Sequence, residues 1–308
     1  MAEGDIELIQ ALYRYRYLRS GQLSRLTERS SQVIRRRLRW LAGQGYVQML
    51  ARGKAEQAAY SLARGGFEFV AHASGVPVSA LPFSRKIDEN KTASFFWRHT
   101  MLVNDVVIAF EQALEEHPRL ALEEVIQEWE LADPRAKAHH RRFRLSERFE
   151  EGGRVLIHRP DACLLLRPRG EDGAPLVAAY LEADRATEPL RRIRGKIEGF
   201  YAYWLRERFV TLRATSMRVL FVLGNVRTDK RIRSMQRTLE TFAKELATRR
   251  GNHEAKRFVS LFRFARAGAL GPGVIDEALW MRGLEQVPSP FLAKTNPQLE
   301  LPFEKPAA

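Results

Sequence analysis

The sequence predicts a protein of mixed helices and strands, α/β in its larger part and α+β overall, with two domains. At 308 residues the chain exceeds the usual size of one domain. The first 75 residues show helical hydrophobic spacing and then two short strand-like segments. Beyond residue 93, strand-like apolar segments alternate with amphipathic helices, which favours a central mixed sheet flanked by helices.

Residues 1–75 are expected to form three helices and a hairpin. Ile6, Ile9 and Leu12 recur at helical spacing, and Leu23 and Leu26 do so in a second, shorter segment. The expected elements are a helix over residues 5–17, a short helix capped by Ser20, a third helix from Ser30 or Ser31 to Gly43 or Gly45, and strands at 46–51 and 58–63. This order is that of a winged helix-turn-helix.

One face of the third helix is cationic. The positions i, i+3, i+4 and i+7 along it are occupied by Gln32, Arg35, Arg36 and Arg39. Arginine and glutamine side chains can read guanine and adenine edges in the major groove, so this face is predicted to recognise duplex DNA. The wing tip offers Arg52 and Lys54 to the DNA backbone. The alternative is a solvated arginine face on a module used for protein contacts.

The composition agrees with a polyanionic partner. The formal net charge is +14 and the isoelectric point is near 10.2, and neutralising phosphates releases condensed counterions. Residues 188–237 hold thirteen Arg and Lys against four Asp and Glu, so Arg191 and Arg192 are candidates to hold a DNA backbone. The alternative is a solubilising helix face.

Other features of the composition concern the compartment. The one cysteine, Cys163, excludes an internal disulfide and a zinc site built from several cysteines. The first ten residues lack a basic segment followed by a long apolar run, and no later stretch approaches the ~20 apolar residues of a membrane span. A cytoplasmic protein without membrane association is expected.

The second domain is expected over residues 93–284, after a linker at 76–92 that is rich in Pro, Gly and mixed charge. Its expected elements are a helix at 93–116, strands at 120–130, 154–166 and 176–184, a helix from Pro189, a strand at 217–224, a basic helix at 229–248 and a strand at 257–264. Residues 285–308 are Pro-rich and are expected to form a flexible tail.

Three acidic residues interrupt apolar strands of this domain. Glu182 and Asp184 are two positions apart, so they point to the same face of a strand. Asp161 begins a separate strand after Pro160. Because unpaired buried carboxylates are expensive, the cluster needs cations, and a divalent metal such as Mg²⁺ or Mn²⁺ held by Asp161 and Glu182 is one solution.

Pro160, Asp161 and Glu182 resemble the motif of the PD-(D/E)xK nuclease superfamily, in which Pro-Asp is followed by acid-x-Lys on the next strand. The resemblance implies a restriction-endonuclease-like fold. Asp184 stands where the motif has lysine, and Lys196 on the following helix could take over the role of positioning and polarising the attacking water. The alternative is that the acids form salt bridges with Arg185, Arg191 and Arg192 in a fold that has lost catalysis.

The winged-helix order, His99-Thr-x-x-Val-Asn-Asp-Val, Arg-Pro-Asp161 and Leu-Glu182-x-Asp-Arg-x-Thr-Glu together look like the plasmid replication-relaxation family. The resemblance covers most of residues 1–265. It implies a DNA-binding protein encoded with plasmids or other mobile elements, with one site lined by His99, Asn104, Asp161, Glu182, Asp184 and Lys196. His99 also falls on the apolar stripe of its helix, and that position by itself indicates a core or interface histidine.

The segment Gln298 to Phe303, QLELPF, resembles the hexapeptide by which bacterial polymerases and repair proteins bind the replication sliding clamp. Leu301 and Phe303 could fill an apolar pocket beside Leu299, and Gln298 could hydrogen-bond at its rim. The alternative is that these apolar side chains pack onto the protein's own surface as an extra strand.

Two functions therefore stay open. One is a metal-dependent DNA endonuclease that nicks or cleaves during plasmid or mobile-element replication or mobilisation. The other is a non-enzymatic DNA-binding replication initiator, transcriptional regulator or mobilisation accessory with a degenerate nuclease fold. The oligomeric state is open, with a dimer as one option.

Overall fold

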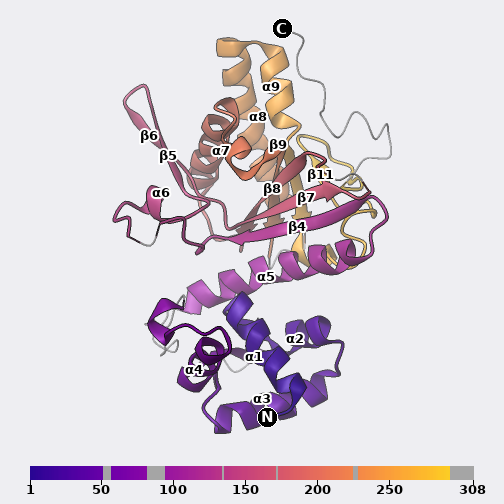
Figure 1. Cartoon of the computed structure of the whole chain (residues 1–308). Coiled ribbons are helices and arrows are strands. Elements are labelled where there is room, and N and C mark those ends of the chain that lie inside the picture. The colour runs from indigo at the N-terminus through magenta and orange to yellow at the C-terminus, as the bar shows by residue number, and fades with distance from the viewer. Residues whose placement is uncertain (51–56, 82–93, 134, 171–172, 225–227, 292–308) are drawn as a thin grey trace. The chain divides into compact units, whose positions relative to one another are not determined.

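Figure 1 shows the computed structural model of the chain. It describes residues 1–50, 57–81, 94–133, 135–170, 173–224 and 228–291. The chain forms two compact units, Met1–Ile108 and Ala109–Ala308. The boundary falls inside helix α5 (Ser94–Glu115), whereas the sequence predicted it at residues 76–92.

The first unit combines helices with a small antiparallel sheet whose strand order is β1-β3-β2. Its elements are α1 (Glu3–Tyr15), β1 (Leu18–Arg19), α2 (Ser20–Thr27), α3 (Ser31–Gly43), β2 (Val47–Met49), β3 (Ala59–Leu62), α4 (Arg64–Ala73) and a 3-10 turn (Val78–Ala80). The prediction missed β1 and α4. Helix α4 contains Gly66, where an added Cβ would lie 2.3 Å from the Tyr46 carbonyl oxygen, so the glycine that suggests a turn in sequence instead permits close packing.

Helices α1 and α3 each bury apolar residues at helical spacing. Ile9 and Leu12, predicted for α1, are buried, as are Ile34 and Leu38 of α3. Arg37 of α3 also pairs with the fully buried Asp5 of α1, with 2.7 Å between Arg37 Nε and Asp5 Oδ1. The hydrogen bond from Arg37 lowers the pKa of Asp5. One arginine of the cationic helix is therefore used to hold the unit together.

The second unit is built on a mixed sheet of six strands among the described residues, in the order β11-β10-β9-β8-β7-β4. Its elements are β4 (Leu120–Gln127), α6 (His139–Arg142), β5 (Glu147–Glu151), β6 (Arg154–His158), β7 (Ala162–Pro168), β8 (Leu176–Asp184), α7 (Leu190–Leu205), a 3-10 turn (Arg208–Leu212), β9 (Ala214–Leu223), α8 (Lys230–Arg250), α9 (Asn252–Val259), β10 (Phe262–Arg266), a second 3-10 turn (Ala267–Ala269) and β11 (Met281–Arg282). Strands β4, β7 and β8 are antiparallel, and β8, β9 and β10 are parallel. The predicted central mixed sheet flanked by helices is confirmed.

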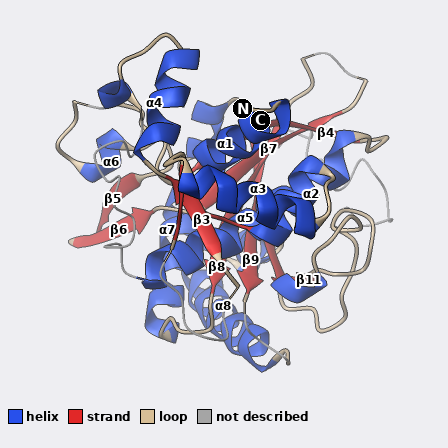
Figure 2. Cartoon of the chain, turned by 90° about the horizontal axis from the view of Figure 1, so that it is seen from below, coloured by secondary structure: helices blue, strands red, loops and turns tan. Residues whose placement is uncertain are grey.

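Helices α7, α8 and α9 share a core with the sheet. Ile197 and Phe200 of α7, Leu239 of α8 and Phe258 of α9 join a cluster with alternate strand residues such as Phe221. In both views α7 and α8 lie beside β8 and β9 (Figures 1 and 2). Successive side chains of β8 point to opposite faces of the sheet, so one set enters this core and the other set lies on the opposite face. Within the described ranges, no helix has the length and apolar character that a membrane span needs.

Two predicted strands of this unit are wrong. The strand predicted at 154–166 is two strands in two sheets, because the chain leaves β6 at His158 and enters β7 only at Ala162, with Pro160 between them. Strand β5, its hairpin partner, was not predicted. The strand predicted at 257–264 is the end of α9 followed by β10. The apolar residues of that stretch fit either structure, and the Ala255 and Phe258 spacing buries one helical face.

The start of the predicted tail is packed. Phe291 is 5% exposed, and its ring centroid lies 5.5 Å from that of Phe110 and 5.8 Å from that of Trp280. The backbone of Ser289 pairs with Trp280 through hydrogen bonds of 3.0 and 2.8 Å. Residues 285–291 thus belong to the second unit rather than to a tail. Residues 292–308 lie outside the described part of the chain.

Candidate functional site

The structure brings Asp161 next to Glu182 at one end of strands β7 and β8. Ala162 lies opposite Leu181 in this antiparallel pair, so Asp161 and Glu182 are the next residues across the ladder. Asp161 Oδ2 accepts a hydrogen bond of 2.7 Å from the Ala183 amide. Both side chains are buried, with 8% and 2% of their surface exposed. The predicted pair of carboxylates is therefore adjacent.

Lys196 reaches the same site from helix α7. Its Nζ lies 2.8 Å from Glu182 Oε2 and 3.0 Å from Glu188 Oε2. Burial disfavours the charge on Lys196, but the carboxylates of Glu182, Asp161 and Glu188 outweigh it and raise the pKa of the ammonium well above its ordinary value. Lys196 therefore stays protonated at neutral pH and acts as a cation rather than as a base.

Asp184 has a different partner. Its Oδ2 lies 2.8 Å from Nε of Arg231 on α8, and Arg231 also donates to the Glu188 carbonyl oxygen. The Gly224 amide donates to the Asp184 carbonyl oxygen at 2.9 Å. Asp184 thus ties the end of β8 to α8 and to the loop before α7. Glu188 and Arg231 were not predicted as site residues, and only the three-dimensional fold brings them to the carboxylates.

The cluster brings four carboxylates close to two cations. The contacts above join Glu182 and Glu188 to Lys196 and join Asp184 to Arg231, whereas Asp161 accepts from the Ala183 amide. Burial raises the pKa of Glu182 to about 8, with Asp161 and Glu188 adding to the rise and Lys196 opposing it. The side-chain oxygen Asp184 Oδ1 is buried without a hydrogen-bond partner.

Asp161 and Glu182 are the residues of this cluster that could hold a divalent cation. Among the described residues, no three His, Cys, Asp or Glu side chains form a ready metal site. Mg²⁺ is often held by one or two protein carboxylates, with water and substrate phosphates completing its shell. Asp161 and Glu182 supply a pair of buried carboxylate donors of the kind that such an ion takes.

Two residues expected at this site belong to the first unit. Asn104 is buried on α5, where its Nδ2 donates hydrogen bonds of 2.9 Å to the carbonyl oxygens of Tyr15 and Tyr17. Its amide joins α5 to the chain between α1 and β1. His99 is half-buried on the same helix. The contact found for Asn104 is structural.

The face of α3 that was predicted to bind DNA is exposed. Gln32, Arg35, Arg36 and Arg39 are all on the solvent side of the helix, whereas Arg37 turns to Asp5. Ser30 caps the helix, since its hydroxyl accepts a hydrogen bond of 3.4 Å from the Val33 amide. Val33 and Trp40, with 36% and 40% of their surface exposed, lie among these polar residues. The wing residues Arg52 and Lys54, and the Gln298–Phe303 segment, lie outside the described residues.

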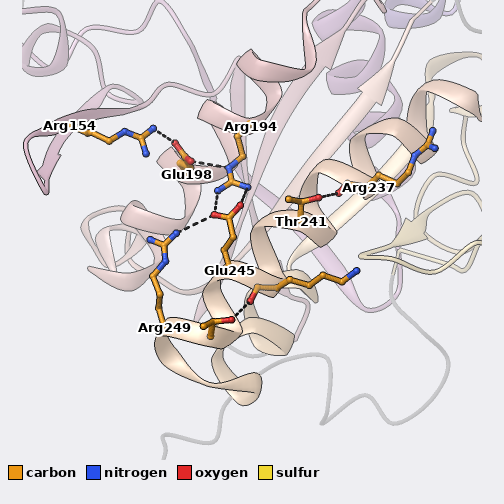
Figure 3. A network of polar contacts seen from close by, with 9 residues as sticks. Arg154, Arg194, Glu198, Arg237, Thr241, Glu245 and Arg249 are labelled. Atoms are coloured by element: carbon orange, nitrogen blue, oxygen red, sulfur yellow. Dashed lines mark hydrogen bonds and ion pairs between the residues drawn. The ribbon is translucent and has the colours of Figure 1, made fainter.

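Part of the basic surface on α7 and α8 is structural. Figure 3 shows Arg194 of α7 between Glu198 and Glu245, with Nε 2.9 Å from Glu198 Oε1 and Nη2 2.6 Å from Glu245 Oε2. Arg249 joins Glu245 at 3.2 Å. Arg191 and Arg192 at the start of α7 are exposed. Of the predicted backbone-binding cations in the second unit, these two remain available at the surface.

A cavity of about 630 Å³ lies elsewhere in the second unit. Its lining comes from α8, α9 and the residues after β11, with Ala243, Ala255 and Leu284 among them. None of the predicted site residues lines it. The cavity and the carboxylate cluster are therefore separate features of the unit.

Comparison with known proteins gives one match. The family model described as replication-relaxation matches residues 9–219, which is more than half of the chain. The matched range contains α3, Asp161, Glu182, Asp184 and Lys196. No curated protein and no solved structure matches the chain.

Proposed function

We propose, from the premise that this chain belongs to the replication-relaxation family, that it is a DNA-binding protein of plasmid or mobile-element replication or mobilisation. The first unit serves as a winged helix-turn-helix whose recognition helix is α3. The family name supplies the link to replication, and the site residues supply the link to DNA.

The exposed face of α3 is the observation that carries the proposal. The helix order, the three-stranded sheet and the capped start of α3 support the winged-helix assignment. Arg35, Arg36 and Arg39 are exposed. Among the arginines of α3, which the structure describes in full, Arg37 is the one paired with a carboxylate. A helix that keeps its arginines on one solvent face, with no acidic residue among them, suits the major groove of duplex DNA.

Two neighbouring arginines provide a matched test. Arg36→Ala removes an exposed cation and should weaken binding to duplex DNA while leaving the melting temperature unchanged. Arg37→Ala removes the partner of buried Asp5 and should lower the melting temperature by several degrees. Fluorescence anisotropy with labelled duplex and thermal unfolding measure the two effects. Equal DNA affinity of Arg36→Ala and the wild type would count against α3.

A metal-dependent DNA endonuclease is the second candidate, and the Lys196 to Glu182 contact favours it. The central-sheet strands β4, β7 and β8, followed by α7 and β9, together with the pair Asp161 and Glu182 resemble the PD-(D/E)xK arrangement, with α6 and the β5–β6 hairpin inserted between β4 and β7. Lys196 supplies from α7 the cation that the motif places where Asp184 stands. This substitution from a neighbouring element keeps an ammonium beside the second acid of the motif.

In this candidate Asp161 and Glu182 hold Mg²⁺ or Mn²⁺. The ion, when bound, would stabilise the charge that develops on a phosphate during hydrolysis. Lys196, held protonated by its carboxylate neighbours, orients water or a phosphate oxygen and does not remove a proton. Asp184 fixes the end of β8 through Arg231.

Incubation of the full chain with supercoiled, linear and single-stranded DNA plus Mg²⁺ or Mn²⁺ tests the second candidate. Cleavage or nicking by the wild type, lost in Asp161→Asn and Lys196→Met, supports an endonuclease. Metal-dependent stabilisation without cleavage, or neither effect, supports the non-enzymatic alternative, a replication initiator, transcriptional regulator or mobilisation accessory with a degenerate nuclease fold. The Arg36→Ala variant should retain metal-dependent stabilisation, which separates the two units.

The QLELPF segment adds a partner to this proposal. Its order of Gln298, Leu299, Leu301 and Phe303 suggests docking on a replication sliding clamp, with weak affinity on the order of micromolar for the free peptide. A peptide of residues 294–308 that binds purified clamp, and fails to do so after Leu301→Ala with Phe303→Ala, supports the partner. A truncation at 295 that lowers the melting temperature, together with no peptide binding, supports intramolecular packing instead.

A further inference from the structure

The segment between β4 and β7 carries a second concentration of positive charge. Residues 134–146 contain five Arg or Lys and no Asp or Glu. The exposed cations of this segment are Arg135, Lys137, Arg141 and Arg142, whereas Arg144 is half-buried. The stretch from Leu131 to Phe143, which includes α6, is called the basic loop below. The positive charge is confined to this segment, because the chain before and after the loop contains acidic residues.

The base of the basic loop is closed by its own contacts. Leu131 and Phe143 form an antiparallel bridge, and the Ala132 amide donates to the Arg142 carbonyl oxygen at 2.9 Å. Arg144 Nη1 lies 2.6 Å from Glu124 Oε1 on β4 and 2.9 Å from Glu130 Oε2. Arg144 therefore holds the loop on the sheet.

The exposed cations of the loop form no ion pairs like those of Arg144. None of Arg135, Lys137, Arg141 and Arg142 has an ion-pair partner among the described residues. Asp133, the nearest acid along the chain, accepts instead from the Arg135 backbone amide at 2.8 Å. Four neighbouring cations without ion-pair partners among the described residues repel one another, and a bound polyanion would relieve this repulsion.

The loop starts and returns at the carboxylate cluster. Strand β4 ends at Gln127, opposite Ala162, and the Glu128 amide donates to the Asp161 carbonyl oxygen at 3.1 Å. Arg159, on the returning chain, lies 3.8 Å from Glu128. Figure 1 shows α6 beyond the end of β4, within the second unit. The loop and Asp161 thus share one end of the sheet.

We propose that the basic loop binds the phosphate backbone of nucleic acid and holds it beside Asp161 and Glu182. The carboxylates of the cluster repel phosphates, and screening over about 8–10 Å means that only nearby cations offset this repulsion. Exposed arginines suit the task, because a guanidinium can donate two hydrogen bonds to one phosphate. This inference rests on the proposed function for the identity of the polyanion as DNA, and it assigns a contact surface separate from α3.

A charge-matched pair of full-length variants tests the proposal. The loop variant carries Arg135→Gln, Lys137→Gln, Arg141→Gln and Arg142→Gln. The control variant carries Arg237→Gln, Lys244→Gln, Arg249→Gln and Arg250→Gln on the exposed side of α8, so both lose the same formal charge. Affinity for a labelled duplex is measured between 50 and 200 mM salt, settings of the order used to resolve counterion release. Thermal unfolding checks that both variants fold.

The loop variant should bind duplex about tenfold more weakly than the control variant, with a salt dependence flatter by about two phosphate contacts. Affinities of the two variants within twofold of each other would overturn the proposal. So would an acidic polypeptide, poly-glutamate, that competes with the labelled duplex as well as unlabelled duplex does, since the loop would then be a general acid-binding surface. The Arg36→Ala variant separates the hypotheses: weak binding there with normal binding of the loop variant keeps α3 and rejects the loop.

Discussion

Lys196 Nζ lies 2.8 Å from Glu182 Oε2, although the two residues come from a helix and from the strand that precedes it. The contact places an ammonium beside a carboxylate that is 2% exposed. A second carboxylate, Glu188, shares the same ammonium. Lys196 is thus the cation that Glu182 and Glu188 share, whatever the site does with DNA.

Removal of the ammonium should therefore destabilise the second unit. Lys196→Met leaves Glu182 and Glu188 without their shared cation and should lower the free energy of unfolding by about 2–4 kcal/mol. Lys244→Met, on the surface of α8, removes an exposed lysine that pairs with Glu240 and should cost less than ~0.5 kcal/mol. Urea unfolding at pH 9, above the pKa of about 8 at which Glu182 ionises in the folded chain, compares them. Equal stability of the two variants would mean that Glu182 does not need Lys196.

The raised pKa of Glu182 predicts a pH dependence. Because burial raises this pKa from 4.5 to about 8, the folded chain keeps a proton here that the unfolded chain has lost between these values. Its contribution to stability is present below pH 4.5 and is lost as the pH rises through about 8. Glu182→Gln cannot ionise, so its stability relative to the wild type should rise by roughly 2 kcal/mol or more from about pH 5 to pH 9.

The control for this pH dependence is Glu240→Gln, which removes an exposed carboxylate on α8. Its stability relative to the wild type should stay constant over the same range. A constant difference for Glu182→Gln as well would show that Glu182 is ionised in the folded chain throughout.

The sequence predicted the parts of the site that depend on local patterns. The polar face of α3 follows from helical periodicity, and the adjacency of Asp161 and Glu182 follows from their places in two strands that pair. Three neighbouring arginines, Arg35 to Arg37, look alike in sequence, and only the fold brings Asp5 of α1 to Arg37. Local pattern cannot separate a structural arginine from one that binds DNA.

Long-range partners explain the other differences. Arg231 of α8 lies beside Asp184 at the end of β8, and no spacing in the sequence signals this contact. The break at Pro160 also depends on long-range partners. The apolar run continues across it in the sequence, but β6 pairs with β5, whereas β7 joins the central sheet. Periodicity describes how a segment folds, and it leaves open which sheet the segment joins.

A pair of glycines on α7 tests the packing of the hairpin formed by β5 and β6. A Cβ on Gly199 would lie 2.1 Å from the Ile157 carbonyl oxygen, whereas a Cβ on Gly195 would meet nothing within 4 Å. Gly199→Ala should cost about 1–3 kcal/mol because the hairpin must shift. Gly195→Ala should stabilise by about 0.5–1 kcal/mol, since alanine is the better helix former. Equal unfolding free energies for the two variants in urea would contradict the packing.

His158 gives a pH dependence of the opposite sign. Its ring stacks on Tyr203 at 3.8 Å, and neither ring nitrogen has a hydrogen-bond partner among the described residues. Burial lowers its pKa from 6.5 to about 3, so its contribution to stability is present above pH 6.5 and is lost as the pH falls through about 3. His158→Phe removes the need to bury a titratable ring.

The His158→Phe variant should therefore gain stability relative to the wild type as the pH falls from 7 to 4, by roughly 1–3 kcal/mol. His158→Ala is the packing control and should be destabilised by about 2–4 kcal/mol at pH 7, because it leaves a cavity beside Tyr203. Chemical unfolding at several pH values measures both. A pH-independent difference for His158→Phe would show that the histidine finds a partner for its proton.

The salt dependence of duplex affinity tests the central claim, DNA binding through α3, most directly. Wild-type chain and Arg35→Ala with Arg39→Ala are titrated onto one labelled duplex from low to moderate salt, and thermal unfolding confirms that the variant folds. If α3 binds DNA, the double variant loses ~2 kcal/mol or more in binding free energy, and its salt slope is shallower by about two phosphate contacts. An unchanged affinity and an unchanged slope in the folded double variant would contradict DNA binding through α3.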